Sequence, residues 1–334
     1  MNKFFSIFAV VFLLAGTGIA AKAQGQFILD KTISLPGDGG YDYLYVNEPT
    51  RTLYVSHGTM VHAIDLKTEK LIGTISGMGG VHGIAVVNDL NRGFISDGKA
   101  NAIIAFDTKT LKIIKSIPIS GTGPDAIIYD PFSKKIFAFC GDSKNASVVD
   151  PKMLTQSGSV DLGGAPEFAV ADGKGLIYNN LEDKSHLDII NTKTLKVIKN
   201  YDLQPCGGPT GMALDLVNQR LFTVCRENKG LSIVDTTNGK VIQTLAIGAG
   251  LDAVEYDATN KLVFASNGDG TATIFKQKTP DQYELMQTLT TQNRAKTMAL
   301  DPLTHKIYFS VATFEPGTRK AIPNSFKLLV YKSK

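Results

Sequence analysis

The chain has 334 residues, of which 43% are apolar and 20% are charged, with 32 glycines and 13 prolines. This composition excludes collagen, a coiled coil and a mainly disordered chain, and the length allows one large domain with a substantial core. The formal charge is +4 and falls by two when Lys3 and Lys22 leave with the N-terminal segment described next. Such a balance gives no global indication of a nucleic acid or an acidic membrane as partner.

Residues 1–23 have the order of a cleavable secretory signal. Lys3 is followed by an apolar run over residues 4–14 and by small residues that end in Ala21-Lys22-Ala23, before Gln24. The run is too short to span a bilayer comfortably, and no later stretch reaches about 18 apolar residues. We therefore expect export to the periplasm or secretion, with no membrane span after signal removal. A retained membrane anchor is the alternative.

From residue 24 onward a pattern repeats about every 42 residues, the length of a four-stranded propeller blade. An Asp or Asn closes one short hydrophobic strand in each repeat. These residues are Asp65, Asp107, Asp150, Asn191 and Asp235. Each is followed by Thr, Lys or Asn before a second β-rich run, and Asx side chains that bond to the backbone two residues on are typical of hairpin turns.

Two further patterns complete the repeat. A glycine-rich segment that ends in proline opens it, as at Gly121 to Pro124, and a strand such as Leu53 to Ser56 follows. Each period thus holds four strands, A to D, with no convincing helix. Seven strand-A openings are counted, and the seventh repeat lacks strand D. Residues 29–35 resemble a strand D, so the N-terminal strand would pair with the C-terminal blade and close the ring, which removes unpaired sheet edges.

We therefore predict that residues 24–334 form a single all-β domain, a seven-bladed β-propeller of four-stranded antiparallel blades. An open solenoid is the alternative. The segments Leu231 to Val241 and Gly248 to Val254 are similar to the YVTN repeat of YncE-like bacterial propellers. The resemblance covers the whole mature chain but departs from the pattern at Lys276 and Tyr331. It implies a secreted or periplasmic protein and, because activities in such families are mostly unassigned, no particular chemistry.

Propeller topology predicts where a ligand would bind. Residues that open strand A and residues that close strand B are expected at the same mouth of the central channel. The candidate ligand-binding residues there are His57, His82, Asp97, Asp125, Glu167, Arg226, Asp252 and Lys296. Acids concentrate in blades 1 to 4 and bases in blades 5 to 7, which suits a zwitterionic or peptide-like ligand, or an anion on the basic side. The alternative is a water-filled channel whose polar lining binds nothing.

Sequence motifs for catalysis or metal binding are weak. We find no HExxH, paired CxxC or GxSxG motif, so no catalytic residue, metal or cofactor is assigned. His57 and His82, with Asp97 and Asp125, could ligate a divalent ion if they converge. Among the three cysteines, a Cys206–Cys225 disulfide is geometrically possible in an exported protein, which would leave Cys140 as a buried free thiol.

Two functions remain open. The favoured one is a non-catalytic binding or scaffold protein that recognises an unidentified small molecule or a protein at the channel mouth. The alternative is a lactonase-like hydrolase or a lyase with its site at the same mouth. The long loop of blade 7, residues 312–325, would overhang the mouth and act as a lid or clamp; the alternative is a solvated loop. Nucleic acid is an unlikely partner, because the basic stretch 319–334 lacks aromatic platforms in a groove.

Overall fold

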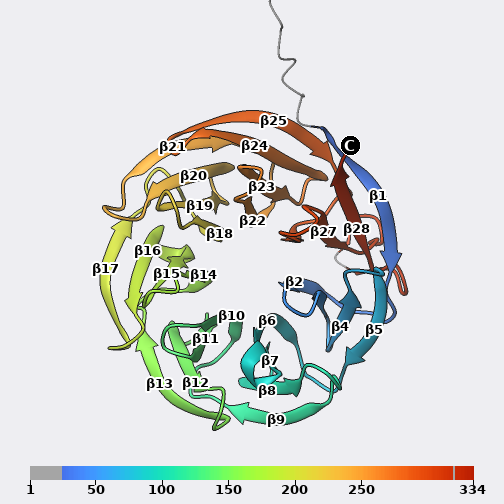
Figure 1. Ribbon diagram of the computed structural model, residues 1–334, viewed down its shortest axis with the longest axis vertical. Helices are drawn as coiled ribbons and strands as arrows, with labels where there is room; N and C mark the ends of the chain where they lie inside the picture. Colours follow the sequence, from blue (N-terminus) through green and yellow to red (C-terminus); the bar gives the residue numbers. More distant parts are fainter. Residues whose placement is uncertain (1–24, 319) are drawn as a thin grey trace, which may run out of the picture.

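Seven four-stranded antiparallel sheets surround a central channel in this computed structural model, which describes residues 25–318 and 320–334 (Figure 1). The predicted seven-bladed β-propeller is therefore confirmed. The predicted signal segment, residues 1–23, lies outside the described residues. Along the described chain we find no helix that is long and apolar enough to cross a membrane.

Each blade runs outward from the channel in chain order, except that blade 7 takes its outermost strand from the N-terminus. The strands of blades 1 to 4 are β2 (Tyr41–Asn47), β3 (Thr52–His57), β4 (Met60–Asp65) and β5 (Lys70–Ile75); β6 (Val81–Val87), β7 (Arg92–Asp97), β8 (Ala102–Asp107) and β9 (Ile113–Pro118); β10 (Pro124–Asp130), β11 (Lys135–Cys140), β12 (Asn145–Asp150) and β13 (Thr155–Asp161); β14 (Pro166–Ala171), β15 (Leu176–Leu181), β16 (His186–Asn191) and β17 (Lys196–Asp202). Those of blades 5 to 7 are β18 (Pro209–Asp215), β19 (Arg220–Cys225), β20 (Gly230–Asp235) and β21 (Val241–Ala246); β22 (Leu251–Asp257), β23 (Leu262–Asn267), β24 (Thr271–Thr279) and β25 (Gln282–Thr290); β26 (Thr297–Leu300), β27 (Ile307–Val311), β28 (Lys327–Ser333) and β1 (Phe27–Ser34). Two single turns of 3-10 helix, η1 (Asn88–Leu90) and η2 (Glu182–Lys184), are the helical segments of the described chain, in keeping with the helix-free prediction.

The second strand of every blade carries an aromatic residue at its third position. These residues are Tyr54, Phe94, Phe137, Tyr178, Phe222, Phe264 and Phe309, and all are buried. Because each sheet packs against a neighbour on both faces, the middle strands read as nearly continuous apolar runs rather than as alternating ones. The core is thus a ring of interfaces between blades, which fixes the inner strands around the channel.

The repeated Asp residues form the turns that the sequence predicts between the third and fourth strands. In blade 2, Asp107 Oδ1 accepts hydrogen bonds from the backbone N–H of Lys109 at 3.0 Å and of Thr110 at 2.7 Å. The chain then passes through a left-handed residue, Leu111, at φ 58°. The equivalent Asp and Asn residues make the same contacts in blades 1, 3 and 4, so the predicted Asx turns are confirmed.

Replacing Asp150 with alanine should lower the free energy of unfolding by about 1–2 kcal/mol at neutral pH. Its carboxylate accepts from Lys135 Nζ at 2.7 Å and from two backbone N–H groups, and chiefly the Lys135 bond lowers the pKa of Asp150 to about 2. Because the pKa is lower in the folded state, the ionised carboxylate stabilises the fold at pH values above the unfolded pKa. This stabilisation is lost as the pH falls toward 2. Urea unfolding of both proteins should therefore differ at pH 7 and converge in strong acid; equal midpoints at pH 7 would contradict this role.

The ring closes as predicted, by pairing of the two chain ends. β1 runs antiparallel to β28, with Phe27 opposite Ser333 and Ser34 opposite Lys327, and Figure 1 shows the two strands side by side. A β-bulge at Asp30 directs this carboxylate toward Lys306 and Lys332, at 3.2 and 2.6 Å. Every sheet therefore has four strands, and the two ends of the chain are held in one blade.

Candidate functional site

A ring of polar side chains surrounds one mouth of the channel. In blades 1 to 6 the ring residue is the second residue of the innermost strand, and in blade 7 it directly precedes β26. The members are Asp42, His82, Asp125, Glu167, Thr210, Asp252 and Lys296. In blades 1 to 6 the pairing register shifts just after this residue, so a β-bulge lies at the mouth in each blade. Bulges of this kind redirect a side chain, here at the end of the channel.

Serine hydroxyls fix the ring backbone where the bulges interrupt the sheet. Ser96 Oγ accepts the N–H of Gly83 at 2.8 Å and donates to the carbonyl oxygen of Asp125, in the next blade, at 2.5 Å. Ser266 does the same between Ala253 and the carbonyl of Lys296. Each hydroxyl thus satisfies a backbone group freed by a bulge and ties the ring residue of the following blade, so the ring is a rigid scaffold.

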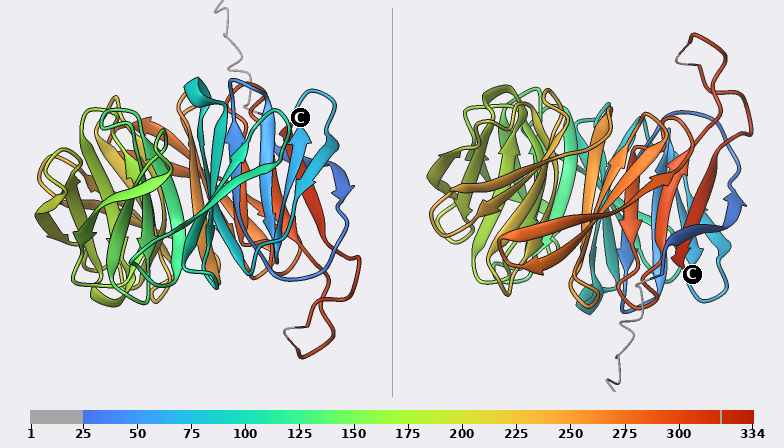
Figure 2. Two further views of the ribbon diagram at one scale, coloured as in Figure 1. Left: turned by 90° about the horizontal axis from the view of Figure 1, so that it is seen from below. Right: turned by 90° about the horizontal axis from the view of Figure 1, so that it is seen from above.

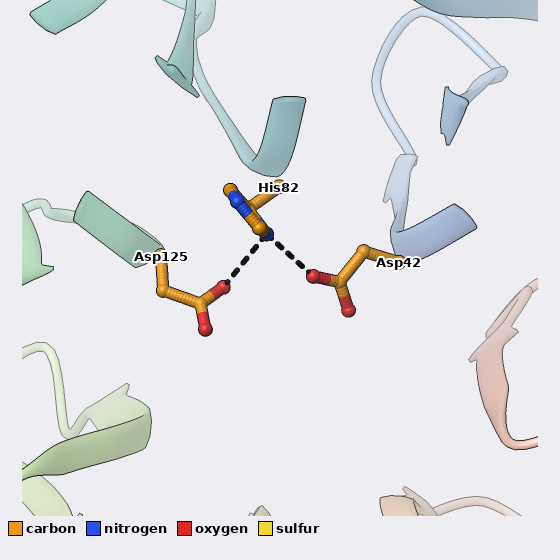
Figure 3. A group of neighbouring side chains, drawn as sticks. All are labelled: Asp42, His82 and Asp125. Atoms are coloured by element: carbon orange, nitrogen blue, oxygen red, sulfur yellow. Dashed lines mark hydrogen bonds and ion pairs between the residues drawn. The ribbon is translucent and has the colours of Figure 1, made fainter. Parts of the chain in front are cut away.

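Three ring residues from neighbouring blades converge, as Figure 3 shows. His82 Nδ1 lies 2.8 Å from Asp42 Oδ2 and 3.5 Å from Asp125 Oδ1. The hydrogen bond with Asp42 raises the pKa of His82. Burial, together with the nearby Asp42 carboxylate, raises the pKa of Asp125 to about 7. The cluster therefore brings two carboxyl groups together around one imidazole.

The bases at the mouth, Lys296 of the ring and Arg226 just after β19 (Arg220–Cys225), are paired with the ring acid Asp252. Asp252 is buried, and its two carboxylate oxygens contact Lys296 Nζ at 2.8 Å and Arg226 Nη2 at 3.4 Å. Arg226 also binds Glu182, in η2 of the adjacent blade. The predicted basic half of the mouth is thus neutralised internally, and it offers less free positive charge than the sequence pattern suggests.

Glu167 is a second acid at the mouth to which no lysine or arginine of the described chain is bonded. Burial, a hydrogen bond with Glu182 and the nearby Asp125 raise the pKa of Glu167 to about 9. A carboxyl group with such a pKa carries a proton at neutral pH. Asp125 and Glu167 thus lie in adjacent blades as two acids to which no lysine or arginine among the described residues is bonded, and the imidazole of His82 lies 3.5 Å from Asp125.

Two aromatic rings close the channel just below the mouth. Tyr43 and Phe168 follow the ring residues of blades 1 and 4, which lie across the channel from each other, and their ring centroids are 4.7 Å apart. Burial and the four ring carboxylates raise the pKa of Tyr43 well above its ordinary value. The mouth is therefore a shallow cup with an aromatic floor rather than an open pore.

This floor and Glu182 are features of the mouth that the sequence did not lead us to predict. A signal for the floor is present, because the position after the ring residue is small in four other blades. Those residues are Gly83, Ala126, Gly211 and Ala253. Bulky Tyr43 and Phe168 at the same position could have been noticed. Glu182 lies in a 3-10 turn outside the repeat, and no sequence pattern points to it.

His57 and Asp97 do not join the ring, and here the structure differs from the prediction. Both end the second strand of a blade and are buried, one strand away from the channel. His57 stacks on Phe326 at 3.9 Å, and its Nδ1 lies 3.2 Å from His62 Nε2. Asp97 accepts backbone N–H groups of Gly79 and Gly80 at 2.8 and 2.9 Å, so its carboxylate shapes a loop. Strand-B residues end at the mouth face but point between blades.

The cysteines are placed as the sequence suggests. Cys206 and Cys225 form a disulfide, with Cα atoms 5.0 Å apart. Cys140 is free and buried, and burial raises the pKa of its thiol. An inert, buried thiol of this kind does not suit a nucleophile.

The long loop of blade 7 stands beside the mouth. Figure 2 shows it projecting from the body of the disc at the rim rather than across the channel, so the predicted lid does not cover the mouth. Arg294 holds its base, because the guanidinium lies 4.0 Å from the ring centroid of Phe314 and donates to the carbonyl of Thr318 at 2.8 Å. A pocket of about 290 Å³ lies between Arg294, Phe314 and Pro316.

The cluster of Asp42, His82 and Asp125 is also where a divalent cation could bind. One ligand atom from each residue lies within 4.8 Å of the others. Imidazole with carboxylates suits zinc and similar ions, although three ligands would leave the coordination incomplete. His57, the other imidazole that the sequence suggested, lies elsewhere.

Comparison with known proteins gives the fold and no more. No protein-family model matches the chain, and no curated protein matches it in sequence. Among solved structures, it is similar to the β-propeller domain of Cps50 (Swd1) from Myceliophteria thermophila, with a TM-score of 0.74 at 12% identity over 92% of this chain and 100% of that one. It is also similar to a chain in the crystal structure of the mitotic checkpoint complex, with a TM-score of 0.75 at 10% identity over 99% of both chains. A chain of hydrazine synthase from Kuenenia stuttgartiensis is similar with a TM-score of 0.72 at 16% identity, over 88% of this chain and 96% of that one.

These identities are too low to transfer an activity, since one fold serves many functions. They do establish that the chain has the same propeller architecture as proteins found in multi-protein assemblies and in an enzyme. The finer resemblance to YVTN-repeat propellers remains a prediction from the sequence.

Proposed function

We propose that the protein is an exported, non-catalytic binding protein, and that its mouth receives a positively charged side chain of a peptide or protein ligand. The observation that carries this proposal is a pair of acids in adjacent blades, Asp125 and Glu167, that lie at the mouth while the nearby bases Lys296 and Arg226 are bonded to Asp252 and Glu182 instead. Burial and nearby carboxyl groups also raise the pKa values of the two acids, to about 7 and about 9. Burial and the neighbouring carboxyl groups favour the protonated form of both acids, and no lysine or arginine of the described chain bonds to either. A lysine or arginine from a ligand would supply the missing charge.

The neighbouring charges favour a cation over an anion. Lys296 and Arg226 are already paired with Asp252, so an anion would have to compete with that buried carboxylate. An incoming cation displaces only protons from Asp125 and Glu167, which makes binding tighter as the pH rises through their pKa values. The rigid serine-tied ring loses little conformational entropy when it binds.

The shape of the mouth face supports an extended ligand. The cup is shallow because Tyr43 and Phe168 close it, so a small molecule would be little enclosed there. The projecting loop of blade 7 adds the pocket at Arg294 and Phe314 next to the rim. A chain that places one cationic side chain in the cup could lay neighbouring residues against this loop.

Export is proposed from the signal-like segment and is compatible with the disulfide. Disulfides persist in oxidising compartments such as the periplasm. The YVTN-like repeats have the same implication, since that family is typical of periplasmic or secreted proteins.

A hydrolase at this mouth is the weaker candidate. His82 is the group that a general base would require, but its hydrogen bond with Asp42 raises the pKa of His82, which favours the protonated ring over the neutral ring that a base needs. Lactone hydrolysis therefore serves as an outcome of the test below rather than as a second proposal.

We expect a short peptide with one lysine, capped at both ends, to bind the wild-type protein more tightly than the same peptide with norleucine. Asp125→Asn and Glu167→Gln should each lower the affinity for the lysine peptide about tenfold, because each removes one carboxylate from a partly desolvated site. Lys296→Ala should leave the affinity unchanged or raise it, since the cation that it removes is a competitor. Isothermal titration calorimetry at pH 8 measures all four proteins.

Asp89→Asn, at the opposite end of the channel, is the matched control and should have no effect. Equal affinity for the lysine and norleucine peptides would overturn the proposal, as would binding that ignores both acid substitutions. If the wild-type protein binds zinc but not the peptide, and His82→Ala abolishes the zinc binding, the mouth is a metal site and not a peptide site. If the wild-type protein hydrolyses a lactone from a test panel and His82→Ala abolishes this activity, the mouth is the active site of a hydrolase.

A further inference from the structure

A large cavity lies below the aromatic floor, away from the mouth. Its volume is about 760 Å³, and the inner strands of blades 1 to 6 line it. Tyr43 and Phe168 close it toward the mouth, while Asp89 and Pro131, in the turns that follow β6 and β10, lie at its other end. It therefore opens on the face opposite the polar ring, and it has the size of a small-molecule site.

The charges on the cavity wall have one sign. Asp89 and Glu255 are the ionisable acids among its lining residues, and this lining contains no lysine, arginine or histidine. Most of the remaining wall is aliphatic. Such a wall disfavours an anion, because a buried negative ligand would meet two acids and no counter-charge.

Glu255 is the acid placed deepest in this wall. It lies in the middle of β22, three residues below the ring residue Asp252, and its carboxyl accepts a hydrogen bond from the backbone of Leu300. Burial raises the pKa of Glu255 to about 8, so it is mainly protonated at neutral pH. None of the paired bases of the mouth contacts it, and the packing of the blades does not require a carboxyl group at a position that is small or apolar in five other blades. Those residues are Ala85, Ile128, Val170, Ala213 and Ala299.

Aromatic residues from several blades share the cavity wall with this acid. Tyr45, Tyr129 and Tyr256 line the cavity with the two floor residues. The faces of aromatic rings attract cations, most strongly where water is excluded, and quaternary ammonium groups are recognised by such walls. An aliphatic wall would bind any apolar molecule, whereas an acid among aromatic rings selects for positive charge.

We propose that this cavity is a second ligand site, separate from the mouth, that binds a small organic monocation with an apolar body. The cationic head would lie against Glu255 and the tyrosine rings, and the apolar part against the aliphatic wall. As the cation enters at neutral pH, the Glu255 carboxyl group releases its proton to solvent and the carboxylate pairs with the head. Binding therefore releases up to one proton per ligand and strengthens as the pH rises.

Benzyltrimethylammonium is the probe that tests this site, with 2-methyl-1-phenylpropan-2-ol as its neutral near-isostere and phenylacetate as the anion. Calorimetry should detect binding of the cation to the wild-type protein. The affinity of Glu255→Gln for the cation should be about tenfold lower, and only the wild-type protein should release a proton on binding. Gln retains an acceptor for the backbone of Leu300, so the variant should fold; its thermal unfolding checks this. The alcohol should bind both proteins equally and more weakly than the cation, and phenylacetate should not bind.

A crossed control separates this site from the mouth. Asp125→Asn should leave the affinity for benzyltrimethylammonium unchanged, and Glu255→Gln should leave binding of the lysine peptide unchanged. Loss of the quaternary ammonium in Asp125→Asn alone would assign it to the mouth and overturn the cavity site. Equal affinity of wild type and Glu255→Gln for the cation, or no binding at millimolar concentration, would overturn it as well.

Discussion

A protein that lacks residues 26–35 should be recovered as aggregates or should unfold far below the wild-type temperature. The deletion removes β1, the outermost strand of blade 7, and leaves the backbone groups of β28 without partners. An unpaired strand edge recruits other chains. It also removes buried Phe27 and Leu35, each of which contributes about 1.5–3 kcal/mol by burial.

The loss extends beyond blade 7, because β1 is also tied to blade 6. Gln287 bonds both the N–H and the carbonyl of Phe27, at 2.8 and 3.0 Å, and the ring of Phe27 packs edge-on against Phe264 at 5.2 Å. We expect a total loss of more than about 5 kcal/mol, which approaches the whole stability of many domains.

Size-exclusion chromatography and thermal unfolding measure this effect, and rescue in trans provides the control. A synthetic peptide of residues 25–36 should restore a monomer to the truncated protein, whereas the same peptide with Phe27 replaced by Ala should do so poorly. A truncated protein that is monomeric and melts like the wild type would contradict closure by β1.

The second large effect is expected at a buried ion pair between blades 1 and 7. The two terminal nitrogens of the Arg51 guanidinium, Nη1 and Nη2, donate to the Asp301 carboxylate at 2.6 and 2.5 Å, and the acid is fully buried. Arg51→Met should cost about 3–5 kcal/mol, because it leaves a buried carboxylate without a counter-charge. The double variant with Asp301→Asn should lose less than the two single variants combined, since it removes the stranded charge.

The same pair makes a prediction about pH. Burial opposes the Asp301 carboxylate, but the hydrogen bonds from Arg51, Thr304 and the backbone of Leu303 together outweigh it and hold the pKa of Asp301 below its ordinary value. Its contribution to stability is complete above the unfolded pKa and disappears as the pH falls through the lower folded value. In urea unfolding, the gap between wild type and Asp301→Asn should narrow in acid; a gap independent of pH, or additive single variants, would contradict this account.

The repeat in the sequence was sufficient to predict the number of blades, their closure and the ring at the mouth. Asp42, His82 and Asp125 share one position in the repeat, and propeller geometry places equivalent positions at equal height around one axis. A ring residue is therefore visible from spacing alone. The disulfide was accessible for the same reason, since both cysteines lie at one end of blade 5.

The repeat did not predict which way a side chain points or which residue it pairs with. His57 has the correct height for the ring, but it lies in a second strand and faces Phe326 rather than the channel. The pairing of Lys296 with Asp252 joins blades 6 and 7, and the repeat pattern does not specify contacts between unlike blades. The cavity at Glu255 was missed because its apolar wall reads as ordinary core.

Carboxyl NMR of Asp125 and Glu167 tests the proposed function most directly. In the free protein the two groups should titrate near pH 7 and pH 9. Both pKa values should fall when the lysine peptide binds, because the ammonium group stabilises the carboxylates, and the norleucine peptide should leave them unchanged. Ordinary values near ~4 in the free protein, or values that do not respond to the lysine peptide, would contradict a mouth built to receive a cation.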